Sequence, residues 1–155
     1  MHMLRGKGGV TLIELAVVLA IVGIMAVFLA PAIGEWLDNY RIRQTARDIV
    51  SQLQFAKMRA ISRRLEYRVC FDLANDEYVL EKNDSGWTQE GGVFHVPTGV
   101  DIASATGSLG NPPKVKFNPN GTCSSGHIKI DNEQGKQYKV VVHYTGRIRI
   151  EESQP

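Results

Sequence analysis

The chain has 155 residues, the length of one ordinary domain, and its formal net charge is +2. Without Arg5 and Lys7, which precede a long apolar run, the remaining 16 basic residues are balanced by 16 acidic ones. This composition excludes a strongly basic nucleic-acid-binding protein, so any basic surface has to be local.

The apolar run begins near the N-terminus and predicts a transmembrane helix over residues 10–33. Leu15 to Ala30 contains no charged or polar side chain, and only Thr11 and Glu14 interrupt the wider stretch. At ~1.5 Å per residue, a helix over residues 10–30 would span roughly 31 Å, about one hydrocarbon core. A cleaved secretory signal does not fit, because the run is too long and Pro31 disrupts the only small-x-small site.

Glu14 is the unusual residue of this run. A carboxylate inside a membrane helix costs a few kcal/mol and by default marks a function. The alternative is an acid at the interface that reaches into water. From the residues alone, both interpretations stay open.

The segment Gly9-Val10-Thr11-Leu12-Ile13-Glu14-Leu15, after a short basic leader, resembles the class III signal of type IV pilins and type II secretion pseudopilins. The resemblance implies that prepilin peptidase removes residues 1–9 and methylates Val10, although phenylalanine or methionine is commoner there. Glu14 becomes the fifth mature residue, where the family pairs its acid with the N-terminal amine of a neighbouring subunit. Pro31 becomes the twenty-second, where a helix-kinking proline is common. Val10 and Glu14 are four residues apart and share one helix face.

A helical pattern continues beyond Pro31 and predicts one helix from Val10 to Arg63, whose second part, residues 34–64, is amphipathic. Apolar residues recur mostly at spacings of three and four: Ile33, Trp36, Leu37, Tyr40, Ala46, Ile49, Val50, Leu53, Ala56, Ala60 and Ile61. Eight basic residues between Arg41 and Arg68 are interpreted mainly as a solvated face, the alternative being attraction to lipid headgroups or DNA.

Residues 65–155 change to a period of two and predict an antiparallel β domain resting on the helix, an α+β fold. Expected strands are Tyr67–Leu73, Tyr78–Glu81, Val93–Val96, Val115–Phe117, His127–Ile130, Tyr138–Tyr144 and Arg147–Ile150. Gly91-Gly92 is interpreted as a turn, and Ala103–Pro113 as a mobile loop.

Two further segments resemble the GspH/FimT family of minor pilins and minor pseudopilins. One is the helix end Leu53–Arg64, and the other is the tail from Phe117 to Arg149. Within the tail, Gly146-Arg147-Ile148-Arg149 resembles a motif linked in FimT-like minor pilins to DNA binding. Strand alternation places Arg147 and Arg149 on one face, with Lys139 on a neighbouring strand as a further candidate, where they could contact phosphates. The alternative is an ordinary half-buried strand.

Cys70 and Cys123 both follow the apolar run, so the positive-inside rule places them in the oxidising periplasm. A disulfide would close a loop of about 54 residues and contribute roughly 4 kcal/mol. The alternative is two separate buried thiols. A zinc site with His127 is disfavoured because no Cys-x-x-Cys pair accompanies it. No catalytic residue, metal or cofactor is expected.

These observations predict a structural minor pilin or pseudopilin of a type IV pilus or a type II secretion system. It would be cut after Gly9, held in the bacterial inner membrane by a single span, with its C-terminal domain in the periplasm, and built into a fibre. Its partners would be other pilin or pseudopilin subunits and prepilin peptidase. The alternative function is a DNA-binding minor pilin for DNA uptake that uses Arg147 and Arg149.

Overall fold

The computed structural model describes residues 11–153, apart from the side chains of residues 27–33 and 35. The chain divides into two compact units, Met1–Leu37 and Asp38–Pro155, and each is described by itself. The helix α1 (Leu12–Arg63) supplies the first unit and the start of the second. α1 passes through Pro31, so the proline does not end the helix, as predicted.

Local chemistry sets both ends of α1. At its start the Thr11 hydroxyl accepts a hydrogen bond from the backbone N–H of Glu14 at 3.2 Å, and the Thr11 carbonyl accepts one from Leu15 at 3.1 Å. This is an N-cap, and an acid in the first turn suits the helix dipole. At its end Arg64 adopts a φ of 55°, the left-handed conformation that commonly follows a last helical turn.

The second-unit part of α1 buries one stripe of side chains. Its buried apolar members, spaced three or four residues apart, are Ile42, Ala46, Ile49, Leu53, Ala56 and Ala60. All but Ile42 were predicted. The predicted stripe is wrong at Tyr40 and Ile61, which are 52% and 47% exposed. At about 100° per residue, Ile61 lies well around the helix from Ala60, and Tyr40 lies nearly opposite Ile42.

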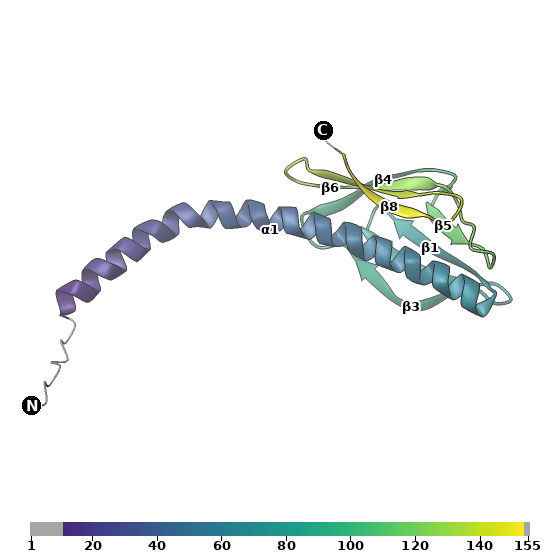
Figure 1. Cartoon of the computed structure of the whole chain (residues 1–155), viewed down its shortest axis with the longest axis horizontal. Coiled ribbons are helices and arrows are strands. Elements are labelled where there is room, and N and C mark those ends of the chain that lie inside the picture. Colours follow the sequence, from purple (N-terminus) through teal and green to yellow (C-terminus); the bar gives the residue numbers. More distant parts are fainter. Residues whose placement is uncertain (1–10, 154–155) are drawn as a thin grey trace, which may run out of the picture. The chain divides into compact units, whose positions relative to one another are not determined.

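Eight antiparallel strands of the described chain form two four-stranded sheets (Figure 1). The first sheet has the order β3 (Trp87–His95), β2 (Glu77–Asn83), β1 (Glu66–Asp72) and β5 (Lys114–Phe117). The second has the order β4 (Val100–Gly107), β6 (Gly126–Asn132), β7 (Gln137–Val142) and β8 (Ile148–Ser153). The predicted α+β class is therefore confirmed.

Two strand predictions need correction. The expected loop Ala103–Pro113 begins inside β4, whose small residues give little alternation but pair with β6, with a shift of register between Asp101 and Ser104. The expected turn at Gly91-Gly92 lies within β3. There the register against β2 shifts between Val79 and Glu81, and Gly91 has a φ of 95°, so the strand continues through a β-bulge.

One hydrophobic core joins α1 to both sheets. The inward side chains of β1 are Tyr67, Val69 and Phe71, each at most 1% exposed, and β6 and β7 contribute a similar alternating set. Figure 1 shows the C-terminal half of α1 lying along the sheets. Because strand side chains alternate, each sheet keeps a second face directed away from this core.

Candidate functional site

The N-terminal motif lies partly outside the described residues, which exclude Gly9 and Val10 and the side chain of Pro31. Glu14 is described and exposed, in the first turn of α1. Within the described part of the chain, its carboxylate has no hydrogen-bond or ionic partner. A partner for this charge therefore has to come from solvent or from another molecule.

The part of the first unit from Leu12 to Met25 exposes its large apolar side chains. Every large apolar residue from Leu12 to Met25 is about half exposed or more, with Leu12 at 88% and Ile13 at 75%. Such a continuous apolar surface is typical of a segment covered by lipid or by other chains. In the part of the chain that the structure describes, no helix is long and apolar enough to be recognised as a membrane span.

The predicted basic residues lie around β8. Arg149 belongs to β8, whereas Arg147 lies in the turn before it, so strand alternation does not set the direction of both. Both are exposed, and Arg149 Nη2 is 3.4 Å from His143 Nε2. Lys139 on β7 lies opposite Glu151 in the β7–β8 register, which reduces the local positive potential.

Lys129, which no sequence motif singled out, faces Lys139 across β6 and β7. Ile128 and Ile130 are buried, so Lys129 between them points to the outward face of β6. Tyr138 and Val140 are also buried, so Lys139 between them points to the same outward face from β7. Like charges directly opposite each other disfavour strand pairing slightly. The two lysines therefore form a small cationic surface that an anion would stabilise.

Gly146, the first residue of the arginine motif, is a packing point. Lys57 Nζ on α1 donates a hydrogen bond to the Gly146 carbonyl at 2.8 Å. Gly146 has a φ of 75°, and a Cβ there would lie 2.4 Å from the Gly121 carbonyl oxygen and 2.8 Å from Lys57 Cε. Only glycine fits between these neighbours, so this residue of the motif has a structural reason to be there.

The sequence left open a disulfide between Cys70 and Cys123 or two separate thiols, and in this structure both cysteines are free. Cys70 lies on the outward face of β1, where its thiol is 3.2 Å from Glu81 Oε2. Cys123 is buried, and its thiol is 3.1 Å from the His143 carbonyl oxygen. Burial raises the pKa of the Cys70 thiol to about 11, helped by Glu81, and burial also raises the pKa of Cys123. The second alternative, two separate thiols, therefore describes this structure, although Cys70 is only partly buried.

Cys123 and His127 do not build a metal site either. Among the residues that the structure describes, no three His, Cys, Asp or Glu side chains are grouped so as to hold a metal ion. The His127 ring instead lies 2.8 Å from the Thr106 hydroxyl on the neighbouring strand β4.

Two family models match the chain, one over its N-terminal segment and one over most of the β domain and the helix end before it. The family described as type II transport protein GspH matches residues 45–146, and the prokaryotic N-terminal methylation motif matches residues 4–30. No curated protein matches the chain in sequence.

Solved structures show the same fold. The minor pseudopilin EpsH from the type 2 secretion system of Vibrio cholerae is similar with a TM-score of 0.61 at 16% identity, over 72% of this chain and 97% of that one. The type IV minor pilin FimU of Pseudomonas aeruginosa is similar with a TM-score of 0.54 at 17% identity, over 70% of this chain and 91% of that one. Since the GspH match spans more than half of the sequence, the chain belongs to the GspH family of type II transport proteins, pilin-like structural subunits rather than enzymes, and it carries the N-terminal methylation motif.

Proposed function

We propose that this chain is a minor pilin or pseudopilin that is cut after Gly9 and assembled through α1 into the fibre of a type II secretion system or a type IV pilus. Before assembly, residues 10–33 anchor it in the inner membrane, with the unit Asp38–Pro155 in the periplasm. The observation that carries the proposal is the exposed apolar surface from Leu12 to Met25, interrupted by the single acid Glu14.

The chemistry of Glu14 explains why assembled helices are preferred to isolated ones. An unpaired carboxylate in an apolar medium is costly, whereas a charge with a hydrogen-bonded counter-ion is much less so. Cutting after Gly9 creates a new amine at Val10. That amine on a neighbouring subunit is a suitable counter-ion, so two separately unfavourable charges become one pair.

The first experiment determines the mature N-terminus by mass spectrometry in cells with and without prepilin peptidase. The expected product begins at Val10 only when the peptidase is present, and Gly9→Leu stays uncut. A product that keeps Met1, or one cut by ordinary signal peptidase, contradicts the proposal.

The second experiment measures incorporation into sheared fibres. Glu14→Gln keeps the size of the side chain but removes its charge, so it should be processed normally and incorporated at least tenfold less. Glu14→Asp, which keeps the charge, is the matched control and should retain more incorporation. Equal incorporation of Glu14→Gln and the native chain would exclude the charge-pairing mechanism.

A second candidate function is DNA binding, which the exposed Arg147 and Arg149 and the facing pair Lys129 and Lys139 favour. Contacts between these cations and phosphates would be independent of sequence and sensitive to salt. A gel shift with the detergent-solubilised full chain should show retardation that weakens with salt and is lost in Arg147→Ala plus Arg149→Ala. Absence of salt-sensitive retardation in the native chain rules this candidate out.

A further inference from the structure

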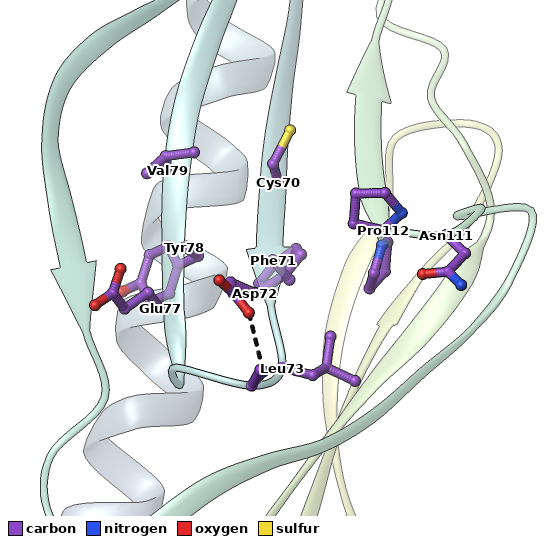
Figure 2. A pocket seen from close by; sticks show the side chains of 11 residues that line it. Cys70, Phe71, Asp72, Leu73, Glu77, Tyr78, Val79, Asn111 and Pro112 are labelled. Atoms are coloured by element: carbon purple, nitrogen blue, oxygen red, sulfur yellow. Dashed lines mark hydrogen bonds between the residues drawn. The ribbon is translucent and has the colours of Figure 1, made fainter.

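The outward face of the first sheet contains a hollow of about 570 Å³ at the end of the β1–β2 hairpin. Figure 2 shows its side chains coming from β1, from β2 and from the segment Asn111–Pro113. Cys70 and Val79 face each other in the β1–β2 register and form part of the floor. Leu73 and Pro112 add apolar surface at the side, so the centre of the hollow is apolar.

Two carboxylates lie at one end of this hollow. Asp72 and Glu77 are partners in the β1–β2 register, beside the hairpin turn. The Asn75 side chain and the backbone N–H of Ala74 donate to Asp72 at 2.7 and 2.9 Å, and these bonds hold the pKa of its carboxyl below the usual value. Glu77 Oε1 lies 3.0 Å from His95 Nδ1. Two acids directly opposite each other repel, so a cation placed between them would be attracted.

Beside the floor at Cys70, charges of both signs are present, because Glu81 Oε2 lies 3.2 Å from the Cys70 thiol. Lys114 on β5 is the register partner of Cys70 on the side away from Val79. The Cys70 thiol itself adds no negative charge, because burial raises its pKa to about 11. An occupant therefore meets an apolar floor with an anionic end at Asp72 and Glu77.

We infer that the hollow receives one apolar side chain of a different protein subunit, whose neighbouring lysine or arginine contacts Asp72 and Glu77. The volume lies in the range of clefts that hold drug-sized groups, roughly 300–1,000 Å³, and is ample for a leucine or phenylalanine side chain. A buried apolar anchor with a charged rim is a common arrangement at protein interfaces. The inference rests on the proposed function only in taking the partner to be another subunit of the fibre.

A peptide selection tests the inference directly. The detergent-solubilised full chain is immobilised and offered a phage library of random nine-residue peptides. Enriched peptides should carry a large apolar residue next to lysine or arginine. Synthetic copies should bind at least tenfold more weakly to Val79→Trp, which fills the hollow, than to the native chain.

The carboxylates are tested separately from the apolar floor. Asp72→Asn plus Glu77→Gln should weaken the same peptides at least fivefold and remove the preference for a cation while leaving the apolar preference. Val141→Trp is the matched control, because Val141 is a partly exposed outward residue of β7 in the other sheet. It should bind like the native chain, and unchanged thermal unfolding of every variant ensures that folding is not the cause.

The inference is overturned if no peptide is enriched over the Val79→Trp selection, if enriched peptides are acidic, or if the double carboxylate variant binds normally. Self-association of the native chain that Val79→Trp abolishes would also overturn it, since the occupant would then be a second copy. In cells, Val79→Trp should still be cut after Gly9 but enter fibres less efficiently. Failure of the peptide selection with normal cutting rejects only the hollow, whereas failure of cutting in the native chain rejects only the proposed function.

Discussion

Gly146 offers the sharpest test of how the second unit is held together, through the substitution Gly146→Ala. The residue joins three segments: α1 through Lys57, the turn containing Gly121, and the turn before β8. A methyl group at Gly146 would lie 2.4 Å from the Gly121 carbonyl oxygen. That separation is far shorter than a carbon–oxygen contact allows, so either the turn moves or the 2.8 Å hydrogen bond from Lys57 is broken.

The expected magnitude comes from two contributions. A left-handed φ costs an L-residue about 1–2 kcal/mol, and overpacking a close contact costs about 1–3 kcal/mol more. Gly146→Ala should therefore lower the free energy of unfolding by about 3 kcal/mol. Gly135→Ala is the matched control, because Gly135 has a φ of 80° but no atom within 4 Å of an added Cβ. Gly135→Ala should therefore lower the free energy of unfolding only by the cost of the left-handed φ, about 1 kcal/mol.

The measurement is urea unfolding of the detergent-solubilised chain, followed by tryptophan fluorescence. Trp87 lies in β3, with the Arg68 guanidinium 4.0 Å from its ring centroid, so its emission reports on the second unit. With an m-value of about 1–3 kcal/mol/M, Gly146→Ala should shift the midpoint by roughly 1–3 M. If the two variants lose the same stability, the close approach at Gly146 does not limit packing and this reasoning is refuted.

Three further predictions use the same protein preparation. Phe71→Ala removes a side chain that is 1% exposed and should cost about 3–5 kcal/mol in the urea titration; a loss below 1 kcal/mol would mean that Phe71 is not a core residue. The Lys116 ammonium and the Asn83 side chain lower the pKa of the Glu66 carboxyl in the folded protein. Ionised Glu66 therefore stabilises the fold by at most ~1 kcal/mol at pH values above its unfolded pKa of ~4.3. This stabilisation is lost as the pH falls through the lower folded pKa. Unfolding titrations at about pH 6, ~4.3 and about pH 3 should show that Glu66→Gln removes this part of the acid dependence, and an identical dependence in both proteins would contradict it. Maleimide labelling of Cys70 should be slow at neutral pH and rise roughly tenfold per pH unit towards about 11, whereas Glu81→Gln should speed it; fast labelling of the native thiol at neutral pH would contradict its burial.

The sequence alone was sufficient for features that depend on near neighbours along the chain. The helix and most strands follow from periodicities of 3.6 and two, which a short segment displays by itself. The N-terminal motif is equally local, since Gly9, Glu14 and Pro31 are recognised by their separations. These short-range patterns predicted the α+β class and the family that the comparisons confirm.

Tertiary structure decided which distant residues meet. The small side chains of β4 give little periodic signal, and pairing with β6 makes them a strand. The two cysteines are separate because Cys70 is on an outward face while Cys123 is buried, a difference that spacing cannot reveal. The contact of Gly146 with Lys57 joins residues 89 positions apart. Such contacts depend on strand register and on helix rotation, which local propensity leaves open and which the burial of one shared core selects.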